Sequence, residues 1–248
     1  MENDYNNSVK GNPVIRRLAE TLTFFRAYFW DIGKFLLYAT FPVIIIENFI
    51  SYYALVYNLP QEVKHLPILV HFLYQPIYTG GLICLIARIA ADETWSMKEC
   101  LLAGLGCWVN LLFVNIISSF LIVFGLFAFI LPGLLIFARL SLAEFIVVLD
   151  RFSFMDALHR SYEISKGLTW QIIGSGVLLS AILLALQLLL HFTIASFSLQ
   201  SLPAFMVSEL LVIVLWSTFT VLLFRFYGLA TKTSQKSDDS DVRALPLN

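Results

Sequence analysis

Four ionisable residues stand inside long apolar stretches of this sequence: Glu47, Arg139, Glu144 and Glu209. An Arg or Asp at the centre of a membrane helix costs about 2.5 to 3.5 kcal/mol on insertion scales, so such charges usually need a partner or a wet cavity. We expect Arg139 to face the interior of a helix bundle and to pair with Glu209 or Glu47. Glu144 is a poor partner, because five residues along a helix place it about 140° away from Arg139.

This cluster has two interpretations. In the first, Arg139 and the three carboxylates line a polar site for an anionic headgroup or a coupling proton. In the second, a buried ion pair fixes the register of the helices and takes no part in binding. The acids outnumber the arginine, which requires either protonated acids or a water-filled pocket. The sequence leaves both interpretations open.

Other residue types capable of chemistry do not form a recognisable catalytic or metal site. Cys84, Cys100 and Cys107 lie in or beside apolar segments without metal-ligand spacing, and we interpret them as packing residues. His71 and His191 each lie four residues from a glutamine, but no third ligand is evident. No nucleophile elbow, zinc-protease motif or complete phosphate-binding loop is present. We therefore expect no enzymatic activity, no metal and no cofactor.

The elements that must position these residues are membrane helices. The chain of 248 residues is 59% hydrophobic and 13% charged, and its mean hydropathy is +0.81. A helix needs about 20 apolar residues to cross a hydrocarbon core of roughly 30 Å. The sequence predicts an all-α polytopic membrane bundle with transmembrane helices at 34–57, 67–90, 101–125, 132–149, 170–192 and 204–229. The domains are then an N-terminal cytoplasmic segment (1–33), a six-helix transmembrane domain (34–230) and a disordered cytoplasmic tail (231–248).

The positions of the basic residues predict the orientation. Fourteen of the sixteen Lys and Arg residues lie on the side of the two termini, whereas Lys64 stands alone on the other side and Arg139 lies within a span. Positive residues favour the cytoplasmic side of a membrane. Both termini are therefore predicted to be cytoplasmic.

Short amphipathic segments precede the odd-numbered spans on the cytoplasmic side. They begin near Pro13, Ser96 and Ser153, and the last two have an acid three residues after the serine, as in a helix N-cap. Three tryptophans are predicted to anchor these interfaces: Trp30, Trp95 and Trp170. The pattern indicates either three copies of one unit, an interfacial helix followed by a transmembrane hairpin, or the amphipathic loops that any such protein needs.

One stretch of the sequence carries a family resemblance. Its residues are Pro132, Gly133, Arg139, Asp150, Ala157, Leu158, Ser161 and Gly167. This pattern resembles the YciC-like family of uncharacterised bacterial inner-membrane proteins and, more distantly, the membrane domain attached to some glycerophosphodiester phosphodiesterases. The resemblance implies a six-helix fold in the bacterial inner membrane. It brings no established activity and no catalytic residue.

These observations favour a non-enzymatic component of the membrane or envelope, which acts through contacts with membrane lipid or with another membrane protein. Basic residues on interfacial helices gain about 1 kcal/mol each near an anionic lipid surface. The alternative is a small-solute or lipid transporter that uses the Arg139 and Glu site. A continuous polar cavity from Arg139 to one face would favour transport. We expect no nucleic acid partner, and the sequence leaves the oligomeric state open.

Overall fold

The fold is a bundle of helices. The computed structural model describes residues 13–196 and 202–243, and this part of the chain contains helices and no strand. Among these residues, six segments are long and apolar enough to cross a membrane: Phe29–Val56, Gln61–Ala90, Trp108–Ala128, Ile130–Asp150, Thr169–Ile194 and Met206–Thr233. The predicted all-α, multi-pass membrane class is therefore confirmed.

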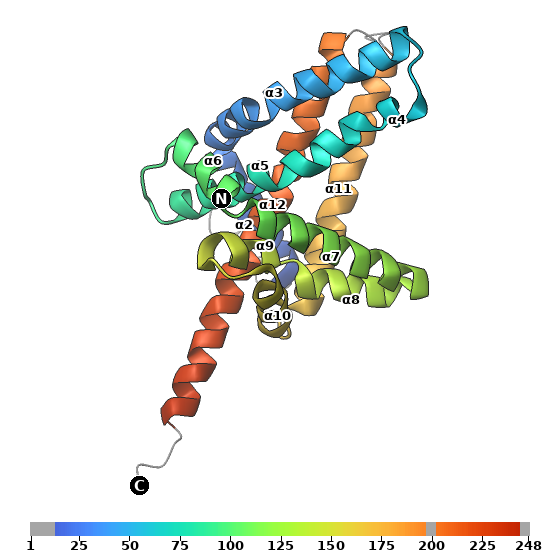
Figure 1. The fold of residues 1–248 in the computed structure, drawn as a ribbon. Coiled ribbons are helices and arrows are strands. Elements are labelled where there is room, and N and C mark those ends of the chain that lie inside the picture. Colours follow the sequence, from blue (N-terminus) through green and yellow to red (C-terminus); the bar gives the residue numbers. More distant parts are fainter. Residues whose placement is uncertain (1–12, 197–201, 244–248) are drawn as a thin grey trace.

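The helices repeat one order three times, a short helix followed by a hairpin of long helices (Figure 1). The first unit contains α2 (Pro13–Ala27), α3 (Phe29–Val56), the short α4 (Gln61–Lys64) and α5 (Leu66–Ala90). The second contains α6 (Met97–Gly106), α7 (Trp108–Ala128), α8 (Ile130–Leu140), α9 (Ala143–Phe145) and a π-helix, η1 (Ile146–Asp150). The third contains α10 (Phe154–Ile164), α11 (Thr169–Ser196) and α12 (Leu202–Arg243). The three predicted amphipathic segments are thus helices, and each begins within one residue of the expected position.

Two predicted spans differ from the helices that form. Residues 101–106 belong to α6, and a new helix starts at Trp108 after the chain turns at Cys107. The predicted fourth span, 132–149, is not one continuous helix, because α8 ends at Leu140 and the chain continues as α9 and η1. Hydropathy alone does not predict either break, because apolar residues lie on both sides of each one.

The end of the chain also differs from the expectation. Helix α12 continues to Arg243, so residues 231–243 are helical where the sequence predicts a disordered tail. These residues contain no Gly or Pro, and a helix that is already nucleated can extend without a second nucleation cost. Residues 1–12 and 244–248 lie outside the described residues, so the predicted N-terminal segment is seen only from Pro13 onwards.

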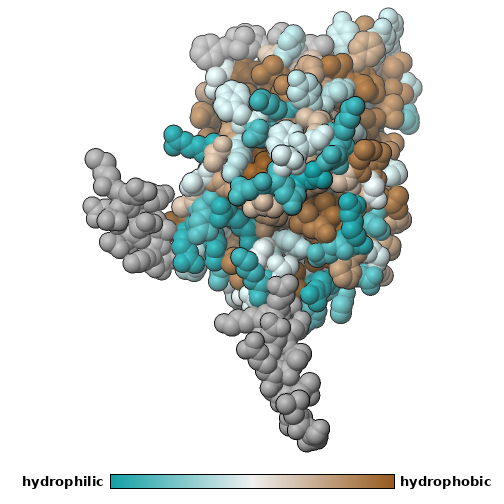
Figure 2. Space-filling model, turned by 90° about the vertical axis from the view of Figure 1, so that its left-hand side faces the viewer, coloured by the Kyte–Doolittle hydropathy of each residue, from teal (hydrophilic) through white to brown (hydrophobic). Residues whose placement is uncertain are grey.

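Two groups of buried apolar side chains hold the helices together. The larger group joins the second and third hairpins and includes the fully buried Phe145, Ile146 and Phe226. The smaller group joins α3 to α5 and α12, with Phe35 and Val221 fully buried within it. Figure 2 shows hydrophilic side chains spread across the side of the molecule that carries α6, with hydrophobic residues between them, and many large apolar side chains of the long helices, such as Ile46, Phe120 and Leu188, are exposed. The long helices therefore keep apolar outer faces, as helices surrounded by lipid do.

Candidate functional site

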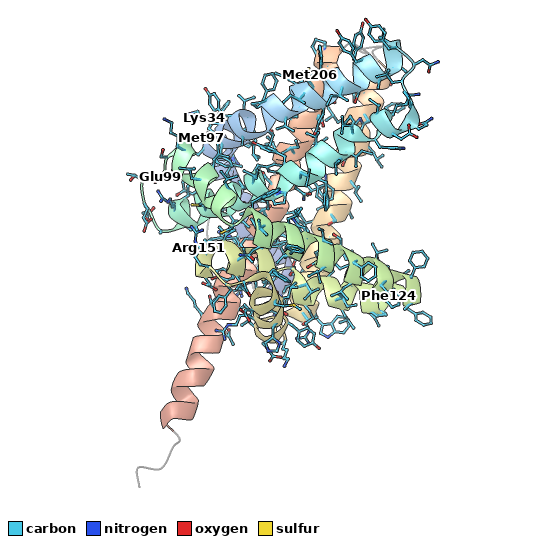
Figure 3. All side chains as sticks on the ribbon, viewed as in Figure 1. Lys34, Met97, Glu99, Phe124, Arg151 and Met206 are labelled. Carbon is cyan, nitrogen blue, oxygen red and sulfur yellow. The ribbon has the colours of Figure 1, made fainter. Side chains whose placement is uncertain are left out.

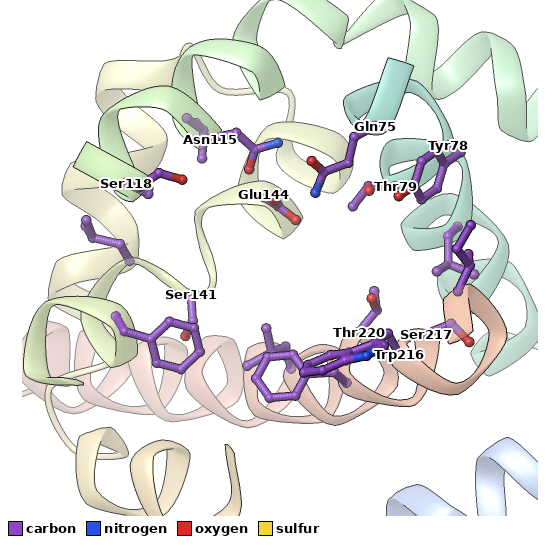
Figure 4. A pocket seen from close by; sticks show the side chains of 18 of the residues that line it. Gln75, Tyr78, Thr79, Asn115, Ser118, Ser141, Glu144, Trp216, Ser217 and Thr220 are labelled. Carbon is purple, nitrogen blue, oxygen red and sulfur yellow. The ribbon is translucent and has the colours of Figure 1, made fainter. Parts of the chain in front are cut away.

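A cavity of about 430 Å³ lies between α5, α7, α12 and the junction of α8 with α9 (Figure 4). All of these elements belong to segments that are apolar enough to cross a membrane. Ten labelled polar or aromatic residues surround the cavity: Gln75, Tyr78, Thr79, Asn115, Ser118, Ser141, Glu144, Trp216, Ser217 and Thr220. The cavity is thus a space lined by both polar and apolar side chains, between helices that are apolar enough to cross a membrane.

Helical geometry explains why these side chains meet. Residues three, four and seven positions apart share one face of a helix. Helix α7 contributes Asn115, Ser118 and Ile122 to the cavity, and α5 contributes Gln75, Thr79 and Leu82. Both sets follow this spacing, so each helix turns one partly polar face towards the same space.

Three polar groups of the lining already have hydrogen-bond acceptors. Ser141 Oγ donates to the Ala138 carbonyl oxygen at 3.1 Å, and Ser217 Oγ donates to the Val214 carbonyl oxygen at 2.6 Å. Trp216 Nε1 donates to Gln187 Oε1 of α11 at 3.0 Å. These bonds satisfy donors of the wall and fix the orientation of the indole at the edge of the cavity.

Glu144 carries the chemistry of the cavity. It is the single acidic residue of the described lining, which contains no Lys, Arg or His. None of the ion pairs formed among the described residues includes Glu144. A charged carboxylate away from bulk water is costly unless a cation or hydrogen-bond donors meet it. The cavity therefore suits a molecule that supplies a cation or several donors.

The predicted pairing of Arg139 with Glu209 or Glu47 is not found. The Arg139 guanidinium lies 5.1 Å from the centre of the Tyr162 ring, and Nη1 donates to the Tyr162 carbonyl oxygen at 3.4 Å. That carbonyl belongs to the last turn of α10, where the helix dipole favours a cation. The prediction assumed one straight span, whereas the break after Leu140 lets α10 lie against the end of α8.

Glu47 and Glu209 have other partners. Glu47 Oε1 lies 3.3 Å from His71 Nδ1, and Glu209 Oε2 accepts a hydrogen bond from Asn48 Nδ2 at 3.1 Å. These contacts connect α3 to α5 and to α12. The group predicted as one cluster therefore divides into the Arg139 contact with α10, the polar contacts around α3, and Glu144 in the cavity.

Several residues of the family-like motif hold the second hairpin to its neighbours. Ser161 is fully buried, and its Oγ donates to the Arg139 carbonyl oxygen at 2.7 Å. Asp150 Oδ1 accepts a hydrogen bond from the Tyr227 hydroxyl of α12 at 2.8 Å. Ala157 and Leu158 are buried in the larger apolar core. Their roles in this structure are packing and positioning.

The predicted interfacial tryptophans lie near the starts of helices. Trp30 and Trp170 stand in the first turns of α3 and α11 and are exposed, and Trp95 is partly buried just before α6. An exposed indole at a helix end suits a membrane interface, where the ring meets apolar chains and the N–H meets water. Their role as anchors stays a prediction.

Glu144 is recognisable in the sequence as an intramembrane acid, but the cavity around it is not. Polar residues at spacings of three and four do mark its walls, as in Asn115, Ser118 and Ser119. Each such set is equally typical of hydrogen bonding between packed helices. Only the distances between helices show that the sets surround one space.

Sequence comparison finds bacterial relatives. Three UPF0259 membrane proteins of Buchnera aphidicola subsp. Acyrthosiphon pisum, from strains Tuc7, 5A and APS, are each 28% identical to this chain over 153 residues. The match covers 60% of this chain and 59% of each relative, so the chain matches about three fifths of their length. No family model matches the chain, and no solved structure matches it. The relatives and the six apolar segments together show a multi-pass bacterial membrane protein, and the name of the relatives states no activity.

Proposed function

We propose that this multi-pass bacterial membrane protein, similar to the UPF0259 membrane proteins, binds the polar headgroup of a membrane lipid in the cavity that contains Glu144. The observation that carries the proposal is a cavity of about 430 Å³, between helices apolar enough for a membrane, in which Glu144 lies among hydroxyl, amide and apolar side chains. Ionisable side chains within spans are expensive and usually face a cavity or a partner. The protein is then a non-enzymatic membrane component that acts through lipid.

The proposal includes the setting that the sequence predicts. The protein resides in the inner membrane with both termini in the cytoplasm, because the basic residues flank the spans on that side. It belongs with the YciC-like proteins that the stretch from Pro132 to Trp170 resembles. A membrane-protein partner remains compatible with this role.

The lining favours one class of headgroup. A carboxylate without basic neighbours attracts an ammonium group, and the surrounding hydroxyl and amide groups can bond to a phosphate ester or glycerol. Phe137, Phe219 and Leu223 supply apolar surface beside these groups, which suits the start of an acyl chain. The volume lies in the range of ordinary ligand pockets, roughly 300 to 1,000 Å³. The best candidate is a zwitterionic lipid with a primary ammonium group.

Transport of a lipid or small solute is the second candidate function. The polar cavity within the spans supports it as well. The sequence-based signature of transport, however, was a polar cavity leading from Arg139, and Arg139 does not line this cavity. Binding without transport is therefore the better supported proposal.

Replacement of Glu144 tests the proposal. The protein is purified in polymer-bounded native membrane particles, its lipids are measured by mass spectrometry, and binding of a short-chain phosphatidylethanolamine is titrated. We expect enrichment of the amine lipid over the bulk membrane and a loss of about tenfold or more in affinity for Glu144→Gln, since hydrogen bonds to charged groups contribute roughly 1.5 to 3 kcal/mol.

Glu209→Gln is the matched control, because Glu209 is an intramembrane acid bonded to Asn48 and lies outside the cavity lining. It should leave the affinity unchanged. No enrichment in the wild-type protein, or equal losses for the two variants, would contradict lipid binding at this cavity.

A further inference from the structure

We propose that the tip of the α7–α8 hairpin ends inside the hydrocarbon core of the bilayer, so that the hairpin enters and leaves the membrane from one side. Helix α7 ends at Ala128 and α8 begins at Ile130, so one residue, Phe129, joins them. The occupant of the surface around this tip is lipid acyl chain. The inference does not depend on the proposed lipid binding.

The sequence around the tip has no polar side chain. Residues 120–138 contain no charged or hydrogen-bonding side chain, and they cover the end of α7, the turn and most of α8. The turn between α3 and α5 differs, since it contains Asn58, Glu62 and Lys64. A turn that reaches water or lipid headgroups needs polar groups of this kind. The apolar turn has groups suited to hydrocarbon only.

The two hairpins also differ in the polarity of the aromatic residues at their ends. The α3–α5 hairpin carries Tyr52, Tyr53 and Tyr57 near its end, whereas the α7–α8 tip carries Phe127 and Phe129 and no Tyr or Trp. Tyr and Trp are enriched at membrane surfaces because one end of the ring is polar. A Phe ring has no polar end. A tip with Phe and without Tyr or Trp therefore suits a position deeper in the bilayer than the surface.

The tip is open to its surroundings. Phe127 is 88% exposed and Phe129 is 77% exposed, and Figure 3 shows Phe124 near the outer end of the hairpin, away from the other helices. Over an 18-residue apolar stretch of α7, 17% of the residues are buried, whereas 33% to 44% are buried in the corresponding stretches of the other five segments. Lipid chains are the medium that accepts such a surface, because a soluble protein rarely exposes so large an apolar patch.

The arrangement of the helices supports a shallow position. In Figure 1 the end of the α3–α5 hairpin, the last turn of α11 and the first turn of α12 lie together at the top, whereas the α7–α8 hairpin runs sideways and its tip lies well below them. Tips on one membrane surface would lie at one level. Helix α8 has only 11 residues before the chain breaks at Leu140, about 16 Å of helix and roughly half of the hydrocarbon core, whereas α7 has 21 residues and is long enough to cross it.

The backbone of the tip is adapted to a medium without water. The Phe129 N–H donates to the Gly125 carbonyl oxygen at 3.0 Å, the Gly133 N–H donates to the Phe129 carbonyl oxygen at 3.4 Å, and Pro132 has no N–H to satisfy. A methyl group added at Gly125 would lie 2.9 Å from Gly133 Cα, so the helices touch through their backbones. Such a tight turn keeps the number of unpaired backbone groups small, as hydrocarbon requires.

The distribution of basic residues cannot distinguish this arrangement from a full crossing. Both ends of the hairpin lie on the same side of the membrane in either case. Accessibility can distinguish them. Single-cysteine additions Phe127→Cys and Phe129→Cys are labelled with a membrane-impermeant maleimide, applied in turn to each face of membrane vesicles. Glu62→Cys and Lys98→Cys, at exposed polar positions, are the matched controls.

We expect Glu62→Cys to react from one face and Lys98→Cys from the other, with the wild-type protein giving the background of the native cysteines. Both tip variants should react at less than about a tenth of the control extent from either face, and fully after detergent solubilisation. Reaction of either tip variant from the Glu62 face at the control extent would overturn the proposal.

Fluorescence quenching separates lipid from protein as the cause of protection. A fluorophore on the tip cysteine should be quenched strongly by lipids brominated in the middle of the acyl chain and weakly by quenchers on the headgroup. Protection without quenching by the brominated lipids would mean that protein covers the tip, and would also overturn the proposal. Two tip variants are used so that misfolding of one, seen by size-exclusion chromatography, leaves the other.

Discussion

Gly104 determines how closely α6 lies on α5. A methyl group at this position would lie 2.1 Å from the Ile77 carbonyl oxygen and 2.8 Å from the Gly81 nitrogen. Both neighbours are backbone atoms, so neither can move aside without shifting a helix. Gly106, two residues later in the same short helix, has room, since its nearest neighbour would be Arg151 Nη1 at 3.8 Å.

Alanine at these two glycines should therefore have different effects. Gly104→Ala overpacks the contact of α6 with α5 and should lower the free energy of unfolding by about 3 kcal/mol. Gly106→Ala should leave stability unchanged or raise it by a few tenths of a kcal/mol, because alanine favours the helix. Thermal unfolding in detergent, followed by circular dichroism, measures both. Equal stability of the two variants would show that the contact is looser than the structure has it.

Single residues show what the sequence can and cannot predict. Small residues in membrane helices are typical of close helix contacts, and Gly104 makes such a contact whereas Gly106 does not. The partner of Arg139 was not predictable, because it depends on a break at Leu140 that is surrounded by apolar residues. Glu144 was recognised as an intramembrane acid, but its cavity depends on four separate helices and on no local pattern.

Helix α10 packs against the C-terminal end of α8. Its N-terminus was predictable, since Ser153 Oγ accepts a hydrogen bond from the Asp156 N–H at 3.4 Å, as the N-cap pattern indicates. Its contact with α8 was not, because the Ser161 and Ser165 hydroxyls reach the Arg139 carbonyl oxygen 22 and 26 positions earlier. These bonds satisfy a carbonyl group near the C-terminus of α8, which the helix itself leaves without a partner.

Removal of the Ser161 hydroxyl should weaken the contact between α10 and α8. Ser161→Ala deletes a buried hydrogen bond of 2.7 Å and should lower the free energy of unfolding by about 1 kcal/mol. Ser96→Ala is the control, since Ser96 is exposed at the start of α6 and makes no side-chain capping bond. It should have no measurable effect. Urea titration in mixed micelles compares the stabilities of the two variants. A larger loss of stability for Ser96→Ala would contradict the role of Ser161 in the contact of α10 with α8.

At the scale of the whole molecule, the first unit and the last unit are in contact. Glu20 of α2 accepts a hydrogen bond from Arg225 of α12 at 3.2 Å, and Arg17 lies at the same distance from its carboxylate. Helix α2 of the first unit therefore packs beside α12 of the last unit. The number of long apolar helices follows from hydropathy alone, whereas the sideways course of α7 and α8 depends on packing that hydropathy does not record.

This arrangement leads to a test of orientation. If the basic side is cytoplasmic, green fluorescent protein fused after Asn248 should fluoresce, because it folds in the cytoplasm, and alkaline phosphatase inserted after Glu62 should be active, because it needs the oxidising space outside the inner membrane. The expected signals are high fluorescence and high phosphatase activity for these two sites. Exchange of the two reporters provides the control and should abolish both signals. Active phosphatase at Asn248 would reverse the orientation and would place the polar α3–α5 turn in the cytoplasm, in conflict with the fourteen basic residues predicted on the opposite side.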